Sequence, residues 1–417
     1  SWPRGSDVRT VRSMQATTSR IAARVRRIKP SPSTSAADRA NELRRQGKSI
    51  VNLVVGEPDF DTPAHIRQAA AAAIERGATR YTLMAGTVEL REAIVAKLER
   101  ENGLRYAMNE IIATSGAKSA IYNAFAITLE PGDEVIIPAP YWVSYPDMVL
   151  ACEGTPVTVA CPESQGFKLA PAQLEAAITP RTRWLLLNSP SNPTGASYTA
   201  QEYRALAEVL ERHPHVMVMT DEIYEHIRFD GETTPHILVQ APSLRDRTLI
   251  VNGVSKTYAM TGWRIGYAAG PVDLIKALDT LLSQSTGNCC SVSQAAAAAA
   301  LNGDQSFVAE SVAVYRQRRD RTLALVNEIP GLSCATPPGA FYLYINCGGL
   351  IGKTTPEGKR LDEDGDVVMY LLESEGVAVV AGTAYGLSPY FRLSIATSIE
   401  TLEEGCKRMA RAVAALR

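Results

Sequence analysis

The sequence has 417 residues, a formal net charge of −1 at pH 7 and 46% hydrophobic residues. This length exceeds what one small hydrophobic core needs, so we expect two domains. A near-neutral charge gives no bulk attraction to nucleic acid or anionic lipid, and no run approaches the roughly 20 apolar residues that span a bilayer. We therefore expect a small-molecule enzyme or binder, with no nucleic-acid or membrane partner.

The first 30 residues are rich in Arg and Ser and nearly free of acids, as organellar presequences are. The run "PRGS" at 3–6 instead resembles a cloning scar, and "SRIAARVRRIKP" at 19–30 resembles a first helix. We treat residues 1–17 as a tag or disordered extension and exclude them from the fold interpretation.

Further along the chain, short apolar runs alternate with amphipathic helical stretches. This alternation predicts an α/β domain with a mostly parallel sheet. The runs are apolar throughout, as expected for strands that are covered on both faces. The strand-like runs are "EIIATSG" (110–116), "GDEVIIPAPYW" (132–142), "TRWLLLNSPSNPTG" (182–195), "HVMVMTDEIYE" (215–225) and "TLIVNGVSK" (248–256).

The pattern changes after a long charged helical stretch that begins near residue 311. Three short strand-like runs and a closing helical run then predict a smaller α+β domain. We assign 63–312 to the large domain, 313–417 to the small domain and 18–62 to the N-terminal part of the small domain. A short N-terminal segment is not expected to fold alone. The four runs are "GAFYLYINC", "VAVVAGTAYG", "YFRLSIATS" and "IETLEEGCKRMARAVAAL".

The seven cysteines form no C-x-x-C pair and their number is odd. We therefore expect neither a disulfide framework nor a metal site, and we expect a reducing, cytoplasmic environment.

Polar residues follow each apolar run of the predicted sheet. In an open parallel α/β sheet, ligands bind outside the carboxyl ends of the strands. The following residues are therefore candidates for one shared site: Ser115, Gly116, Tyr141, Trp142, Asn188, Asn192, Asp221, Tyr224, Ser255 and Lys256.

Taken singly, these residues also have structural explanations. Ser115 and Gly116 can cap a helix, although free N–H groups at a helix start also bind phosphate. Asp221 can cap a helix over "EIYEHI" or face a protonated ring nitrogen. Trp142 can belong to the core, and Asn192 to a turn.

The run "VNGVSKTYAMTGWRIGY" at 251–267 places Lys256 at a strand end and Arg264 eight residues later. Arg264 suits bidentate contact with phosphate or carboxylate. Desolvation and like charge should lower the pKa of Lys256, which favours the neutral amine that attacks carbonyls. A phosphate cradle, such a lysine, an acid and an aromatic residue together describe a pyridoxal phosphate site. Arg392, inside an apolar strand, either faces solvent or has a buried partner.

Seven motifs, in order and at matching spacing, resemble the fold-type-I pyridoxal-phosphate-dependent aminotransferases. More narrowly, they resemble the bacterial branch that holds aspartate and prephenate aminotransferases (class I, subgroup Ib). The resemblance covers residues 19–415 and implies the family's fold, its cofactor pyridoxal 5'-phosphate and a homodimer with shared active sites. The motifs are "GEPDFDTP", "PYWVSYP", "NSPSNPTG", "DEIYEHI", "NGVSKTYAMTGWRIGY", "GAFY" and "FRLSIATS".

The resemblance also implies residue roles. Lys256 is implied to form the Schiff base with the cofactor and to shuttle a proton. Asp221 is implied to partner the pyridine nitrogen. Asn192 and Tyr224 are implied to donate to the phenolic oxygen, and Trp142 to stack on the ring. The phosphate is implied to lie against the segments of Ser115, Gly116, Ala117, Ser255 and Arg264, and against Tyr81 of the neighbouring subunit.

For the substrate, the resemblance implies an α-carboxylate clamp at Arg392, with the backbone of Gly56 beside it. Asn192 and Trp142 border the same place. Lys118 matches a lysine that meets a distal carboxylate, and Lys29 lies near a segment linked to prephenate use.

The resemblance implies that aspartate or glutamate donates an amino group to a 2-oxo acid such as 2-oxoglutarate, by a ping-pong mechanism. The alternatives are a prephenate or aromatic amino-acid aminotransferase, a lyase, and a non-catalytic cofactor-binding regulator. The absence of a basic helical module argues against the regulator. The physiological donor, and the effect of Cys289 and Cys290 near the site, stay open at this stage.

Overall fold

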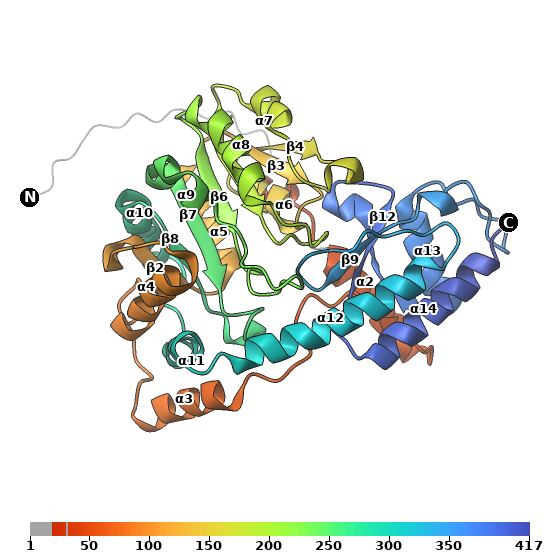
Figure 1. Ribbon diagram of the computed structural model, residues 1–417, viewed down its shortest axis with the longest axis horizontal. Coiled ribbons are helices and arrows are strands. Elements are labelled where there is room, and N and C mark those ends of the chain that lie inside the picture. Colours follow the sequence, from red (N-terminus) through yellow and green to blue (C-terminus); the bar gives the residue numbers. More distant parts are fainter. Residues whose placement is uncertain (1–18, 31) are drawn as a thin grey trace, which may run out of the picture.

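The computed structural model describes residues 19–30 and 32–417, with the backbone alone for 32–36. The predicted tag or extension at 1–17 lies outside the described residues. The molecule has two lobes, one built around a large sheet and one around the C-terminal strands and helices, with α12 running along both (Figure 1).

The large lobe contains a seven-stranded sheet with the order β2-β8-β7-β6-β5-β3-β4. β8 is antiparallel to both of its neighbours, and the other neighbouring pairs are parallel. The predicted mostly parallel α/β sheet is therefore confirmed. The strands are β2 (Ile111–Thr114), β3 (Glu134–Ala139), β4 (Thr155–Ala160), β5 (Thr182–Asn188), β6 (Met217–Asp221), β7 (Thr248–Gly253) and β8 (Gly266–Ala269).

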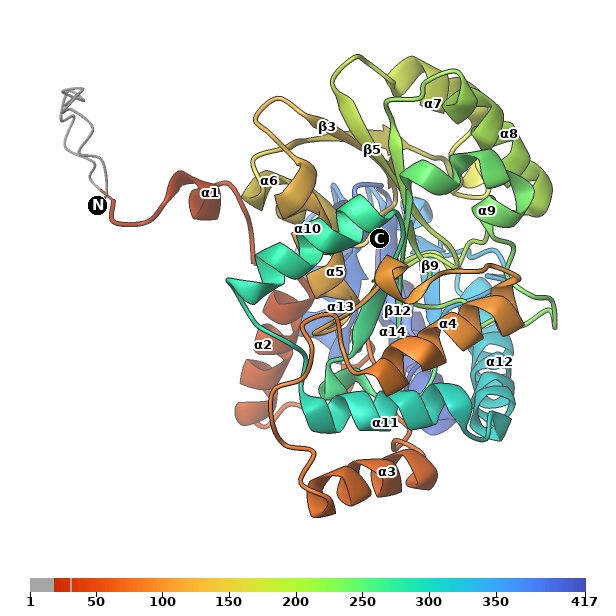
Figure 2. The same cartoon turned by 90° about the vertical axis from the view of Figure 1, so that its left-hand side faces the viewer.

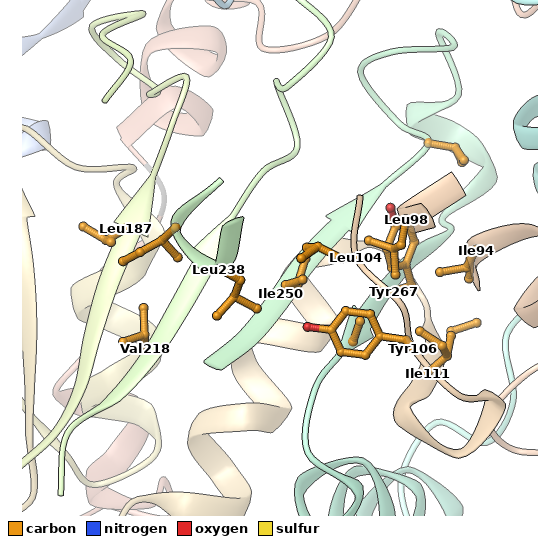
Figure 3. Close-up of a cluster of buried hydrophobic side chains, with 14 of the residues drawn as sticks. Ile94, Leu98, Leu104, Tyr106, Ile111, Leu187, Val218, Leu238, Ile250 and Tyr267 are labelled. Carbon is orange, nitrogen blue, oxygen red and sulfur yellow. The ribbon is translucent and has the colours of Figure 1, made fainter. Parts of the chain in front are cut away.

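The central strands are apolar throughout because helices cover both faces of the sheet. Leu187, Val218 and Ile250 pack into one core with Ile94 and Leu98 (Figure 3). The alternate strand residues, among them Leu186, Met219 and Val251, pack into a second core on the opposite face. Successive side chains of a strand point to opposite faces, so both sets must be apolar. This burial holds the strand ends in a rigid arrangement.

The helices of the described residues follow in chain order. They are α1 (Ala23–Arg26), α2 (Pro32–Arg45), α3 (Ala64–Glu75), α4 (Val88–Asn102), α5 (Ala117–Thr128), α6 (Ser144–Ala151), α7 (Pro171–Ala177), α8 (Ala200–Glu211), α9 (Ile237–Gln240), α10 (Val272–Ser283), α11 (Ser291–Asn302), α12 (Ser306–Asn327), α13 (Asp364–Glu375) and α14 (Ile399–Ala414). Among the helices described, none is long and apolar enough to cross a membrane.

The second lobe holds two small sheets. β1 (Val51–Asn52) pairs in parallel with β10 (Val377–Ala378). β12 (Tyr390–Ser394) lies between β11 (Val380–Ala381) and β9 (Tyr342–Asn346), antiparallel to both. The pairing of β1 with β10 brings the N-terminal segment onto the C-terminal one. α12 runs without a break through residues 312 and 313, so we keep the domain limits as a proposal.

Two local expectations differ from the structure, and one strand was not expected. The segment "EIYEHI" forms a turn rather than a helix, so Asp221 caps no helix. The first helix is only four residues long and lies on the outside of the molecule (Figure 2). The edge strand β4 was not expected, because its exposed and partly buried positions give it no continuous apolar run.

Candidate active site

The carboxyl ends of β2, β3, β5, β6 and β7 meet at one edge of the sheet and open into a cavity of about 450 Å³. Arg264 reaches the same edge because it precedes β8, whose first residue pairs with the last residues of β2 and β7. The predicted site residues that line the cavity are Gly56, Ala117, Lys118, Trp142, Asn188, Asn192, Asp221, Tyr224, Ser255, Lys256, Arg264 and Arg392.

Five predicted site residues do not line this cavity. One of them, Tyr141, borders a separate small hollow with Phe167 and Tyr198. Ser115 and Gly116 directly precede Ala117 in the chain and lie at the margin of the cavity. Tyr81 is 97% exposed and borders a separate hollow with residues 286–291. Lys29 is exposed, and its backbone N–H donates to Asp147 Oδ1 at 3.3 Å. Within this one chain, Tyr81 and Lys29 therefore lie away from the cavity that most of the other candidate site residues line or border.

Lys256 is partly buried at the wall of the cavity, and its Nζ donates a hydrogen bond to the carbonyl oxygen of Gly56. Burial lowers the pKa of Lys256 to about 8, with a further contribution from the charge of Arg392. The lowered pKa agrees with the sequence-based expectation, although the charge of Arg392 contributes more to this lowering than that of Arg264. An amine with this pKa has a substantial neutral fraction near pH 8, which a nucleophilic or proton-transferring lysine requires.

Asp221 ends β6 and is 4% exposed. Its Oδ2 accepts a hydrogen bond from the hydroxyl of Tyr145 at 2.5 Å, and its Oδ1 accepts one from the N–H of Ile223 at 3.3 Å. Burial raises the pKa of Asp221 to about 6, and the bond from Tyr145 opposes that rise. The Asp221 carboxylate therefore lines the cavity in buried surroundings, with a short hydrogen bond from the Tyr145 hydroxyl.

The start of α5 forms a small cradle beside Arg264. Gly116 has φ +87° and no side-chain cap, and a Cβ on it would lie 2.3 Å from Nη2 of Arg264. A Cβ on Gly266 would lie 2.3 Å from the backbone nitrogen of Ala117. The first N–H groups of a helix have no intrahelical acceptor and attract anions. Glycine at both positions thus leaves room for an anion between a helix N-terminus and a guanidinium.

Arg392 is buried in the middle of β12 rather than facing solvent. Its Nη1 donates to Asn192 Oδ1 at 3.0 Å, and its Nη2 donates to the carbonyl oxygen of Val54 at 2.7 Å. Its Nε is buried and has no hydrogen-bond partner among the residues that the structure describes. A buried guanidinium with an unused donor, and with no carboxylate partner in the described part of the chain, is suited to bind an anionic ligand.

Trp142 and Lys118 form another wall of the cavity. Lys118 Nζ lies 4.9 Å from the centre of the Trp142 ring. Burial, with a contribution from the charge of Arg264, lowers the pKa of Lys118. No ion pair joins Lys118 to a carboxylate in the described part of the chain, so its ammonium is free to meet one.

Sequence reasoning missed several residues of the cavity wall. Tyr342 lies in "GAFY", and its hydroxyl is 2.7 Å from that of Tyr224. Tyr145 lies in "PYWVSYP", three residues after Trp142. Glu57 lies in "GEPDFDTP" and accepts a hydrogen bond from Thr261 at 2.7 Å. All three lie in or border motifs that were recognised, and position within a motif was the only available signal.

Outside the cavity, Glu101, Glu225 and His226 bring three possible metal ligands together. The ammonium of Lys97 already lies among them, as it pairs with Glu225 and donates to Asn102 Oδ1 at 2.8 Å. This cluster is therefore an ion-pair network centred on the buried Lys97 and Glu225.

The cysteines are free thiols. Cys289 is buried, and burial raises the pKa of its thiol to about 11, a rise that the side chain of Ser115 opposes; Cys290 is exposed.

The chain belongs to the aminotransferase class I and II family, whose model matches residues 48–409. It is a pyridoxal-phosphate-dependent aminotransferase, and the resemblance found in the sequence is confirmed.

Among its relatives is an aspartate aminotransferase of Rhizobium meliloti (strain 1021), 56% identical over 376 residues, which cover 90% of this chain and 91% of that protein. An aspartate/prephenate aminotransferase of Cereibacter sphaeroides is 54% identical, over 92% of this chain and 96% of that protein. The crystal structure of the aspartate aminotransferase from Rhizobium meliloti matches with a TM-score of 0.94 at 53% identity, covering 95% and 99%. The structure of the aspartate aminotransferase from Thermus thermophilus with maleate matches with a TM-score of 0.87 at 42% identity. The match covers 94% of this chain and 99% of that protein.

Proposed function

We propose that this enzyme transfers the amino group of aspartate or glutamate to a 2-oxo acid such as 2-oxoglutarate. The observation that carries the proposal is the pair of cationic groups at one cavity, buried Arg392 and Lys118. Among the described residues, the Nε of Arg392 has no hydrogen-bond partner and Lys118 has no carboxylate partner. Two cations suit a substrate with two carboxylates. The names of the relatives, which include aspartate aminotransferases, support the same substrate class.

The residues present fit pyridoxal phosphate. The cradle formed by Gly116, Ala117 and Arg264 would hold the phosphate, with Ser115 and Ser255 at its side. Asp221 would hold the pyridine nitrogen, and Trp142 would cover the ring. Asn192 and Tyr224 would donate to the phenolic oxygen. When bound, the cofactor withdraws electrons from the α-carbon of the amino acid.

Lys256 then serves two tasks with one nitrogen. Its lowered pKa leaves the amine partly neutral, so Nζ can attach to a carbonyl carbon and can also take up and return a proton. Arg264 would stay charged as the phosphate partner. The two basic side chains of the motif at 251–267 thus have separate roles.

Arg392 and Asn192 orient the substrate end of the cavity. Because Asn192 Oδ1 accepts from Arg392, its amide N–H groups are left to donate towards the cavity. The substrate α-carboxylate would accept from the Arg392 guanidinium beside Gly56. Donor and acceptor would bind in turn at the same place, which is the physical basis of ping-pong kinetics.

A second candidate substrate class is prephenate or an aromatic amino acid. Besides Trp142, the cavity is lined by apolar Val54, Ile121 and Val143, and several relatives carry the name aspartate/prephenate aminotransferase. A panel of amino donors and keto acceptors that includes prephenate decides between the two. A higher kcat/KM for aspartate than for phenylalanine supports the first proposal, and a clear preference for aromatic donors would overturn it.

We also propose a cytoplasmic homodimer with shared active sites. Tyr81, Leu83 and Val88 are 97%, 60% and 49% exposed, and such neighbouring apolar side chains are typical of an interface. Burial of Tyr81 against a second subunit would bring it to the phosphate of that subunit's cofactor. Sedimentation of the holoenzyme tests this, because a monomer with full activity would contradict it.

A further inference from the structure

A buried phenol lies against the acid that we propose as the partner of the pyridine nitrogen. Tyr145 belongs to α6, is 1% exposed and donates from its hydroxyl to Oδ2 of Asp221 at 2.5 Å. The ring is held in place by an edge contact with Trp142, whose centroid is 5.3 Å away at 89°. The phenol and the carboxylate therefore have a fixed mutual orientation.

The other groups around Asp221 give its carboxylate weaker support. The N–H of Ile223 reaches Oδ1 at 3.3 Å, and Asn188 donates to the backbone oxygen rather than to the carboxylate. Glu222 adjoins Asp221 with a like charge, while the charge of Lys256 is opposite. Within the described residues, Tyr145 is the one side chain that donates to this carboxylate.

We propose that Tyr145 is a positioning residue that keeps Asp221 ionised and correctly oriented towards the pyridine nitrogen, an inference that rests on the proposed role of Asp221. A carboxyl group in a dry interior tends to become neutral, and a neutral acid is no counter-ion for a protonated ring. A short O–H···O⁻ bond offsets this tendency. Burial raises the pKa of Tyr145 well above its ordinary value, so the phenol keeps its proton and remains a donor.

The test variant is Tyr145→Phe, which removes one oxygen and leaves the ring. The matched control is Tyr370→Phe, because Tyr370 is also buried and its hydroxyl donates to the carbonyl oxygen of Ala412 at 2.6 Å, in the other lobe. In the holoenzyme, Tyr145→Phe should move the pH midpoint of the visible absorbance of the lysine-bound cofactor upward by about half a unit or more. It should lower kcat about tenfold while KM for the amino donor changes little.

A second measurement uses the apoenzyme and needs no activity. Loss of the donor should lower the thermal unfolding midpoint more at about pH 8, where Asp221 is ionised, than at about pH 5, where it is largely protonated. Tyr370→Phe should lower the midpoint equally at both pH values.

An equal loss at both pH values together with an unmoved absorbance midpoint would overturn the role of Tyr145. If instead the wild-type enzyme developed no visible band with pyridoxal phosphate, the proposed function itself would fail. The two failures are therefore distinguishable.

Discussion

Replacement of Arg392 by Gln tests how the substrate carboxylate is held. The change removes a buried guanidinium that spans Asn192 and Val54 and has one unused donor. Loss of one partner of a buried, hydrogen-bonded charge pair costs about 2–5 kcal/mol. At about 1.4 kcal/mol per tenfold, kcat/KM should fall by roughly 30-fold to several thousandfold.

The fall should be similar for every amino donor, because every donor carries the α-carboxylate. Steady-state kinetics with aspartate and with phenylalanine measure this directly. The matched variant is Lys118→Gln, which should lower kcat/KM about tenfold for aspartate and leave phenylalanine nearly unchanged. If Arg392→Gln impaired acidic donors alone, the assignment of the α-carboxylate to Arg392 would be refuted.

Three further predictions concern the cofactor, the fold and pH. Gly116→Ala adds a Cβ that would lie 2.3 Å from Nη2 of Arg264 at φ +87°, so pyridoxal phosphate should bind at least about tenfold more weakly in a fluorescence titration. Lys97→Met leaves the buried Glu225 carboxylate without its ammonium partner, so urea unfolding should show a loss of about 3–5 kcal/mol, which Lys97→Met with Glu225→Gln should partly restore. In the apoenzyme, the pKa of Lys256 is about 8, below its ordinary value of 10.5. The unfolded chain therefore binds more protons between these values, and the stability difference between wild type and Lys256→Met should shift in favour of wild type as pH rises from about 8 to about 10.5. A pH-independent difference would contradict the burial of that amine.

Much of the site could be predicted because parallel strands bring their carboxyl ends to one edge. Asp221 and Lys256 follow continuous apolar runs, so their placement needed only the strand assignment. Whether the Arg392 side chain points to solvent or to the interior could not be derived in the same way. Its inward direction depends on Asn192, which is distant in sequence. Tyr145 was missed because its hydroxyl meets Asp221 through tertiary packing that no local pattern records.

Other expectations depend on groups outside this chain. Tyr81 is exposed here, and its proposed contact with a cofactor requires a second subunit. Lys29 does not line the cavity of the single chain, so its role near the substrate stays a prediction. The edge strand β4 was not predicted, as its exposed positions remove the apolar run that identified the inner strands.

The central claim is that Lys256 is the attachment point of the cofactor, and covalent trapping tests it most directly. The holoenzyme is reduced with borohydride and digested, and peptide mass spectrometry then locates the pyridoxyl phosphate group. The account predicts the added mass on Lys256 and no such label in Lys256→Ala. A label on another lysine of the wild-type enzyme, or an unlabelled Lys256 in an active holoenzyme, would contradict it.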